Sequence, residues 1–320
     1  MSARDNPPAA QPVPATSRTE ILRAIIRRHR RWDVTFSVLG LLALSVGILT
    51  LAALFFDMAV QGIPRLTGDF FTSFPSRRPG QAGILSAWVG SVLVMGVTAL
   101  VAVPVGIAGA VYLEEYAPKN WFTDVIEINI SNLAGVPSII YGLLALGLFV
   151  YTFGLGQSIL TAGLTLALLI LPIVITTTRE AMRSIPQHVR EAAYACGASQ
   201  YQVVSNHLLP YSTPGILTGV IIGLSRAIGE TAPIITIGAL TFIAFLPPVP
   251  FTGDPPAGLF AWLFSPFTVM PIQIFNWTSR PDTAFQQNAA AASFVLVFMT
   301  MGMNGLAIWL RYRLRKNITW

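Results

Sequence analysis

Long uncharged apolar stretches dominate the pattern of hydrophobic and polar positions along this chain. A stretch of about 20 apolar residues is the signal of a membrane-spanning helix. Five such stretches cover residues 34–56, 84–113, 128–151, 158–178 and 288–310. The pattern therefore predicts an all-α membrane protein.

A sixth apolar stretch, residues 211–246, is too long for one straight crossing at about 1.5 Å rise per residue. Gly229, Pro233 and Gly238 offer places where a helix can bend or end. We expect one crossing helix followed by an irregular or re-entrant piece, with two short crossings as the weaker alternative. The expected total is six transmembrane helices.

The distribution of basic residues predicts the orientation, because cytoplasmic segments carry an excess of Lys and Arg. Fifteen of the 20 Lys and Arg fall before residue 34, at Lys119, between the fourth and fifth spans, and in the last ten residues. Four lie on the other side, and Arg226 lies inside a span. Both termini are therefore expected in the cytoplasm, which requires an even number of crossings.

The composition supports a membrane protein. Hydrophobic residues make up 53% of the 320 positions and charged residues only 11%, whereas a soluble protein carries about a quarter as charges. The net charge of +6 would favour nucleic acid, but the basic residues follow the membrane topology, so no nucleic-acid partner is expected. A single cysteine, Cys196, excludes an intrachain disulfide and a cysteine metal cluster.

Three regions are expected along the chain. Residues 1–33 form a cytoplasmic N-terminal tail that is partly disordered and basic, residues 34–314 form the transmembrane domain, and residues 315–320 form a cytoplasmic C-terminal tail. The two sizeable outer loops, residues 59–83 and 247–285, are rich in Pro, Gly and aromatic residues. This composition predicts short helices or turns there.

Catalysis by this chain is not expected. A phosphate-binding P-loop needs Gly-Lys-Ser/Thr, and the two lysines, Lys119 and Lys316, follow Pro and Arg instead. The three histidines lack metal-ligand spacing, so no metal or cofactor is expected in this chain. An acidic group on one cytoplasmic loop is interpreted as solvated charge. Its members are Glu114, Glu115, Asp124 and Glu127.

The cytoplasmic segment 184–210 is expected to form a helix, a tight turn and a second helix. Gly197 can adopt the left-handed conformation that ends a helix. Ser199 is placed to cap a second short helix that runs to Leu209, where Pro210 is expected to stop it. Few charges interrupt this segment, which suits burial against another protein.

The spacing of the motif in this segment resembles the EAA loop of ABC importer permeases. The matching positions are Glu191, Ala192, Ala193, Gly197, Leu209 and Pro210. The resemblance implies that residues 184–210, here called the coupling segment, dock into a separate cytoplasmic ATPase. His207 departs from the family pattern, which usually has Ile there. The alternative is an amphipathic linker that lies on the bilayer.

Two ionisable residues, Arg226 and Glu230, lie inside the predicted spans. A single charge at mid-bilayer costs roughly 2.5–3.5 kcal/mol on insertion scales, so such residues are functional candidates. Their i, i+4 spacing lets the two side chains pair on one helix face. A purely structural ion pair between helices is the alternative.

Two further stretches resemble phosphate-specific ABC permeases. Residues 225–234 read SRAIGETAPI, similar to the family's RA-x-GETAP stretch, and residues 133–142 read LAGVPSIIYG, similar to AG-x-PS-x-x-YG. The ending GETAP resembles the PstA branch more than the PstC branch. The resemblance implies a type I ABC importer (MetI-like) permease fold in a bacterial plasma (inner) membrane.

The resemblance also implies partners. This chain would pair with a PstC-like permease above a PstB-like ATPase dimer, which binds ATP and Mg²⁺, and a PstS-like protein would deliver inorganic phosphate. An anion crossing hydrocarbon needs a compensating cation. We hypothesise that phosphate competes with Glu230 for Arg226, and that Thr231, Ser138 and Tyr141 also line the pathway.

Other interpretations remain open. Gly135 and Pro137 are expected to break or thin the third span, and packing explains Ser138 and Tyr141 as well as a substrate role does. An ABC permease for another oxyanion, such as phosphonate or molybdate, would carry the same charges. A stand-alone secondary transporter or channel would use Arg226 and Glu230 as an ion relay, but would leave the coupling segment unexplained.

Overall fold

A computed structural model describes residues 15–251 and 258–315, and every regular element within those ranges is a helix. The chain divides into two units, Met1–Asp57 and Met58–Trp320. Within these described ranges, five helices are long and apolar enough to cross a membrane, or six if one bent pair counts as a single span. Each of the six predicted apolar stretches therefore contains at least one helix.

In the first unit, the described residues belong to one helix, α1 (Ala15–Gly62), which contains the first predicted span. The helix begins within the predicted tail and runs into the span without a break, so residues 15–33 are helical. Residues 1–14 of the predicted tail lie outside the described residues, so partial disorder of the tail stays a prediction. Strong helix formers between residues 20 and 31, such as Leu, Arg and Ala, explain the early start.

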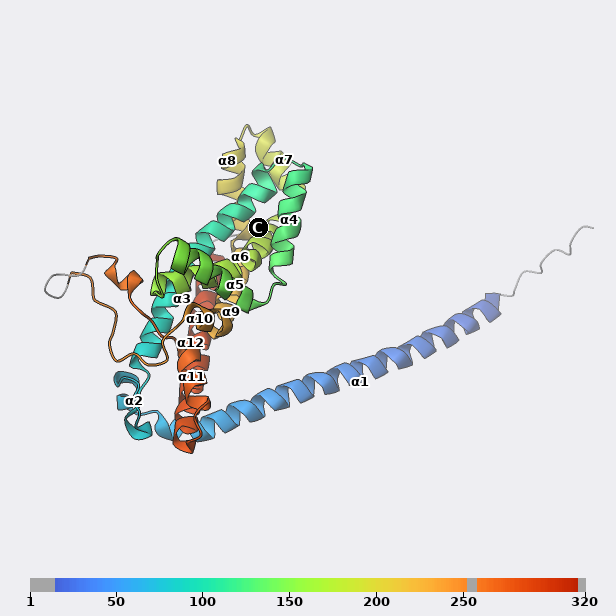
Figure 1. Cartoon of the computed structure of the whole chain (residues 1–320). Coiled ribbons are helices and arrows are strands. Elements are labelled where there is room, and N and C mark those ends of the chain that lie inside the picture. Colours follow the sequence, from blue (N-terminus) through green and yellow to red (C-terminus); the bar gives the residue numbers. More distant parts are fainter. Residues whose placement is uncertain (1–14, 252–257, 316–320) are drawn as a thin grey trace, which may run out of the picture. The chain divides into compact units, whose positions relative to one another are not determined.

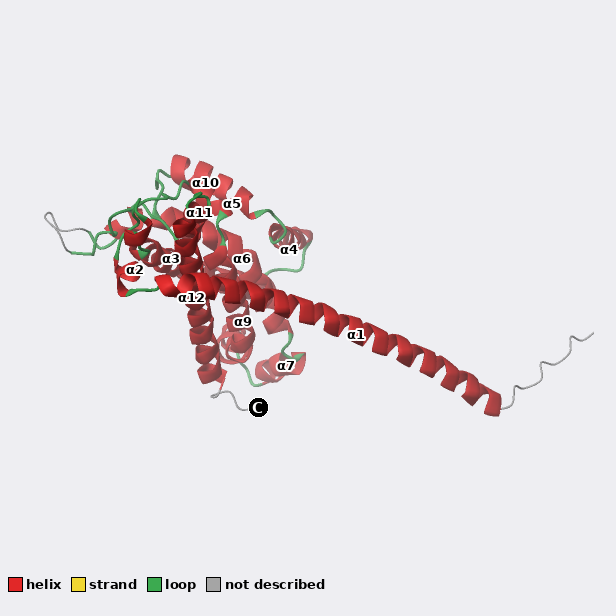
Figure 2. Ribbon diagram, turned by 90° about the horizontal axis from the view of Figure 1, so that it is seen from below, coloured by secondary structure: helices red, strands yellow, loops and turns green. Residues whose placement is uncertain are grey.

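The second unit is built around three helices that pack side by side (Figures 1 and 2). They are α3 (Leu85–Val111), α6 (Ile159–Arg183) and α9 (Leu209–Gly229). A fourth long helix, α12 (Thr283–Arg315), packs against α9. The helix α6 lies between α3 and α9 and is the most buried of the candidate spans.

Small residues bring these helices close together, as is usual where lipid provides no hydrophobic drive for association. On α6, Gly163 faces Val97 of α3, and the Thr98 hydroxyl donates a hydrogen bond of 3.2 Å to the Gly163 carbonyl. On α9, Gly219 lies directly against Thr177 of α6. Glycines therefore let α6 approach α3 at Gly163 and α9 at Gly219.

The third predicted span is a broken helix, where a single crossing over 128–151 was expected. The helices α4 (Trp121–Leu133) and α5 (Ser138–Ala145) meet at an angle of 108°, and a π-helical turn, η4 (Leu146–Thr152), follows α5. Gly135 and Pro137 lie in the break, as expected from their chemistry. Pro137 is extended (ψ 135°) and has no N–H to continue the helical ladder.

The loops at one end of the second unit form short helices, as their composition predicts. These elements are η1 (Ile63–Arg65), α2 (Gly68–Thr72), η2 (Pro79–Gln81), η6 (Ala261–Phe264) and α11 (Met270–Thr278). Arg65 holds the first loop in place: its Nε donates to Asn288 Oδ1 at 2.7 Å, and its Nη2 donates to the carbonyls of Pro79, Gly80 and Ala82 at 2.8–3.0 Å. The opposite end carries α7 (Gln187–Ala195) and α8 (Gln200–Val203) (Figure 1).

Candidate functional site

The two stretches that resemble phosphate-specific permeases meet in space although about 90 residues separate them. The helix α5 packs against a short helix, α10 (Ala232–Ile237), that follows the Arg226–Glu230 pair. The two helices come close at Gly142, where a Cβ atom would lie 2.7 Å from Pro233 Cα and 1.8 Å from Thr236 Oγ1. Only glycine fits at this position without displacing α10.

The predicted ion pair is present at the end of α9. Arg226 lies in the last turn of the helix, and its Nε lies 3.2 Å from Glu230 Oε1. The helix ends at Gly229, and the extended backbone of Glu230 redirects the chain into α10. Region 211–246 is thus one long helix followed by a short helix and an irregular segment.

The accessibility of this pair bears on what it can bind. The Arg226 side chain is 41% exposed, and the Glu230 side chain is 19% exposed. Within the described part of this chain the guanidinium is therefore open to further contacts. Thr231 and Ser138 are half-buried, and the Thr231 hydroxyl lies 3.5 Å from the Gly229 carbonyl.

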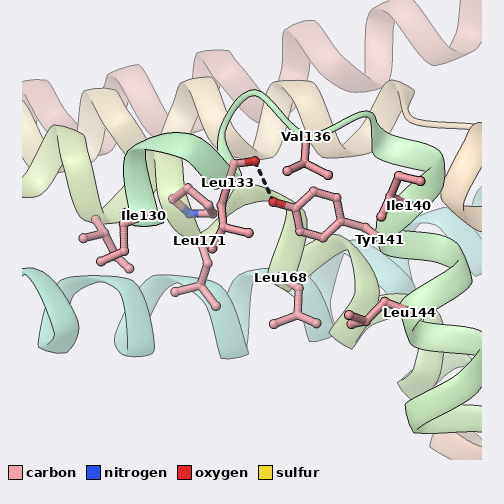
Figure 3. Close-up of a pocket in the computed structure, with 10 residues that line it drawn as sticks. Ile130, Leu133, Val136, Ile140, Tyr141, Leu144, Leu168 and Leu171 are labelled. Carbon is pink, nitrogen blue, oxygen red and sulfur yellow. Dashed lines mark hydrogen bonds between the residues drawn. The ribbon is translucent and has the colours of Figure 1, made fainter. Parts of the chain in front are cut away.

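Tyr141 supports the break in the third span. It is buried, and its hydroxyl donates a hydrogen bond of 2.8 Å to the Leu133 carbonyl, which also accepts a hydrogen bond of 3.1 Å from the Val136 N–H across the break. Its ring lines a cavity of about 330 Å³ between α4, α5 and α6, together with aliphatic side chains such as Leu168 and Leu171 (Figure 3). An apolar cavity does not suit an anion, so the geometry favours a structural role for Tyr141.

The coupling segment has the expected helix–turn–helix layout. The helix α7 (Gln187–Ala195) ends just before Gly197, which is left-handed with φ +84°. The helix α8 (Gln200–Val203) begins with a capping box between Ser199 and Gln202. Glu191 and Ala192 face outward, whereas Ala193 is buried against residues of α6 and α8.

The prediction that Pro210 stops the second helix is wrong. The helical backbone continues from α8 through a π-helical turn, η5 (Val204–Leu208), and directly into α9. Pro210 stands in the first turn of α9. In the π turn the backbone hydrogen bonds are spaced by five residues instead of four. The helical path therefore continues through Pro210, although proline has no N–H to donate. Leu209 and Pro210 therefore join the coupling segment rigidly to α9.

The interpretation of the acidic group as solvated charge is wrong for three of its four members. Glu114 and Glu115 lie in a π-helical turn, η3 (Tyr112–Tyr116), at the end of α3, and their side chains are 14% and 9% exposed. Glu127 pairs with an arginine of α6. Asp124 alone of the four is an exposed residue.

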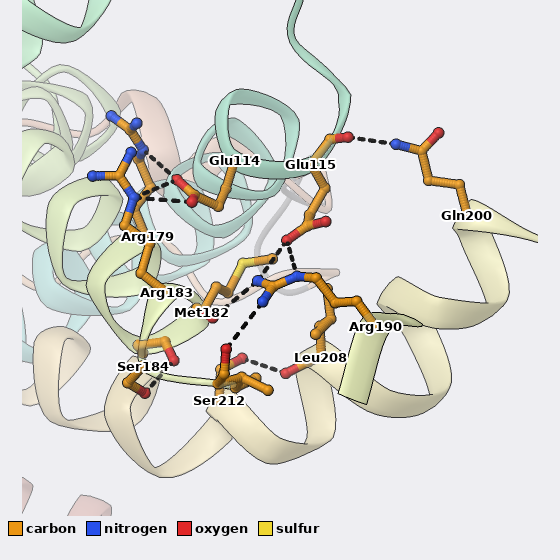
Figure 4. Close-up of polar contacts among 12 residues, drawn as sticks. Glu114, Glu115, Arg179, Met182, Arg183, Ser184, Arg190, Gln200, Leu208 and Ser212 are labelled. Atoms are coloured by element: carbon orange, nitrogen blue, oxygen red, sulfur yellow. Dashed lines mark hydrogen bonds and ion pairs between the residues drawn. The ribbon is translucent and has the colours of Figure 1, made fainter. Parts of the chain in front are cut away.

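These carboxylates pair with arginines of α6 and α7 (Figure 4). Glu114 lies between Arg179 (3.3 Å) and Arg183 (2.9 Å), and Arg179 also pairs with Glu127. Glu115 pairs with Arg190 of α7 at 2.9 Å. The sequence contains a signal for this network: two adjacent carboxylates end one apolar span, and three arginines follow another on the same predicted side.

Comparison with known proteins places this geometry in context. Residues 102–320 match the model of the family described as binding-protein-dependent transport system inner membrane component. The chain is similar to a probable ABC transporter permease protein, YqgI, of Bacillus subtilis, with 31% identity over 88% of this chain and 96% of the relative. It is also similar to the phosphate transport system permease protein PstA of Mycobacterium leprae, with 34% identity over 69% of this chain and 68% of the relative.

The fold is similar to that of a solved transporter. A chain of a bacterial ABC transporter involved in the import of the acidic polysaccharide alginate superposes with a TM-score of 0.57, covering 93% of this chain and 96% of that chain at 15% identity. The predicted fold of an ABC importer permease is therefore confirmed.

Proposed function

This chain belongs to the binding-protein-dependent transport system inner membrane component family, and on that premise we propose that it forms half of the membrane pathway of an ATP-driven importer of inorganic phosphate. The similarity to a PstA protein supports phosphate as the substrate. The meeting of the two phosphate-permease motifs at Gly142 and Pro233 supports a common site.

The observation that carries the proposal is the partly exposed Arg226 beside Glu230. A phosphate dianion in hydrocarbon is costly unless a cation compensates its charge, and a guanidinium fits a phosphate with two parallel hydrogen bonds. Phosphate replaces Glu230 at Arg226 in one state of the transport cycle, and Glu230 holds the guanidinium when no anion is present. Thr231 and Ser138, both half-buried, supply hydroxyls along the same pathway.

We assign ATP hydrolysis to a separate subunit. The coupling segment, with Glu191 and Ala192 exposed, docks into a PstB-like ATPase dimer that binds ATP and Mg²⁺, and this chain holds no cofactor. A PstC-like permease forms the other half of the pathway, and a PstS-like protein delivers phosphate from outside. In this arrangement α7 and α8 face the cytoplasm, both termini lie there, and the α11 end faces outward.

Substitution of Arg226 tests the proposal. In cells that lack the native gene, Arg226→Gln is expected to abolish uptake of radiolabelled phosphate without reducing the amount of assembled complex. Arg226→Lys keeps the charge but loses the two-pronged contact, so partial uptake is expected. The matched control is Arg77→Gln, because Arg77 is an exposed arginine in the loop before η2. Normal uptake by Arg226→Gln would remove the proposed role.

Competition separates phosphate from other oxyanions. Unlabelled phosphate is expected to suppress uptake of labelled phosphate, whereas equal concentrations of molybdate or a simple phosphonate leave most uptake intact. Stronger competition by either of those anions would show that the chain serves a different oxyanion.

A further inference from the structure

Glu115 ties the coupling segment to the end of α3 through two contacts. Arg190 of α7 approaches Glu115 Oε1 with Nη2 at 2.9 Å and Nε at 3.3 Å. From α8, the Gln200 side-chain amide donates to the Glu115 backbone carbonyl (Figure 4). Both charged side chains are largely buried, with 19% of Arg190 and 9% of Glu115 exposed. We refer to Glu115, Arg190 and Gln200 as the clamp.

Arg190 also binds the end of α6. Its Nη1 donates to the Ile185 carbonyl at 3.0 Å, and its Nη2 donates to the Met182 carbonyl at 3.1 Å. The guanidinium thus makes four contacts to three acceptor oxygens: Glu115 Oε1 and the carbonyls of Ile185 and Met182. One side chain therefore connects α7 to both α6 and α3.

Apolar contacts also hold the coupling segment, apart from the clamp. A buried cluster joins Met182 of α6 to five residues of the segment: Ile185, Ala193, Val203, Val204 and Leu208. The left-handed Gly197 and the Ser199 capping box shape its turn. From α3, Val111 packs against this core. The clamp therefore adds a polar link to α3 that the local fold of the segment does not require.

At its other end, α3 contacts the loop that contains α11. The Ser91 hydroxyl of α3 accepts a hydrogen bond of 2.8 Å from the Met270 N–H, and both residues are buried. A Cβ atom at Gly90 would lie 2.1 Å from the Thr268 carbonyl oxygen, so the two backbones touch. Between Ser91 and Glu115 the helix rises about 36 Å, which is enough to cross the bilayer core.

We propose that Glu115 is a positioning residue that fastens the coupling segment to α3, so that α3 transmits movement between the ATPase side and the outer loop at α11. Without the clamp, displacement of the segment reaches α9 directly through the continuous helix. It reaches the end of α3 only through apolar contacts such as Val111 and indirectly through α6, whose Arg179 and Arg183 pair with Glu114. With the clamp, α3, α6 and the segment move as one body. This inference rests on the proposed function, because it requires that the coupling segment docks into a separate ATPase and moves with it.

The test uses the complete transporter in proteoliposomes, with the phosphate-loaded binding protein outside, and measures phosphate imported and ATP hydrolysed together. Glu115→Gln and Arg190→Gln each remove one charge, and Glu115→Arg combined with Arg190→Glu restores an opposite pair. Asp124→Asn is the matched control, because it removes an exposed carboxylate of the same acidic group. Co-purification of the ATPase with each variant measures assembly.

In each single variant the ratio of phosphate imported to ATP hydrolysed is expected to fall at least about fivefold, the low end of typical coupling between sites. The ATPase should still co-purify, the reversed pair should regain part of the ratio, and Asp124→Asn should match wild type. A wild-type ratio in both single variants would overturn the proposal. So would loss of the ATPase from both, with no recovery in the reversed pair, because the clamp would then serve assembly alone. Absence of phosphate import by the wild-type complex would instead refute the proposed function.

Discussion

The contact between α5 and α10 makes a specific prediction about Gly142. In Gly142→Val the new Cβ would lie 1.8 Å from Thr236 Oγ1, 2.7 Å from Pro233 Cα and 2.8 Å from the Pro233 carbonyl oxygen. The Thr236 hydroxyl also hydrogen-bonds that carbonyl at 2.8 Å, so its rotation would sacrifice this bond. The backbone contacts with Pro233 leave no flexible group that can give way.

The displacement follows from ordinary contact distances. Carbon atoms in contact lie about 3.5–4.0 Å apart, so α10 must retreat by roughly 0.8 Å or more to accept even the first added carbon. Overpacking of this kind costs about 1–3 kcal/mol. Because α10 directly follows Glu230 and Thr231, its retreat also shifts the carboxylate that faces Arg226.

Gly142→Val is therefore expected to lower the melting midpoint of the purified complex by several degrees, at about 2–4 °C per kcal/mol, and to reduce phosphate uptake strongly. The matched control is Gly147→Val, since nothing lies within 4 Å of a Cβ at Gly147. The melting midpoint and the phosphate uptake of Gly147→Val should both be close to those of the wild type. If Gly142→Val shows wild-type uptake and a wild-type melting midpoint, the close contact between Gly142 of α5 and Pro233 of α10 is refuted.

Two further predictions concern other parts of the chain. Arg65→Gln is expected to destabilise the loop that contains η2 by about 2–3 kcal/mol, because a charged donor to Asn288 and three carbonyls is lost. Faster amide hydrogen exchange in residues 80–82 measures this, and unchanged exchange would contradict it. Pro210→Ala is expected to cost less than about 1 kcal/mol and to retain uptake, because the helix already continues through Pro210. A large loss of uptake in Pro210→Ala, with the ATPase still bound, would contradict that expectation.

Local chemistry was predictable from the sequence. The Arg226–Glu230 pair depends on an i, i+4 spacing, and the break at Gly135 and Pro137 depends on residues that cannot continue a helical ladder. The left-handed turn at Gly197 follows from the same kind of local preference. Each of these features is determined by residues within one or two helical turns.

Features that depend on distant partners were not predictable in this way. From the sequence alone, Glu114 and Glu115 are interpreted as solvated charge, because the arginines that pair with them lie more than 60 residues further along the chain. The contact between Gly142 and Pro233 likewise requires knowledge of how α5 and α10 pack. The prediction that Pro210 ends a helix failed because a π turn precedes the proline, and a π turn has no clear sequence signature.

Transport by the reconstituted protein tests the central claim most directly. Proteoliposomes containing this chain and its second permease are prepared with and without the ATPase subunit, and uptake of radiolabelled phosphate is followed after ATP is supplied on the ATPase side. The account predicts uptake only when both the ATPase and ATP are present. Phosphate movement down its gradient through the permease subunits alone would contradict it and would identify a channel or secondary transporter.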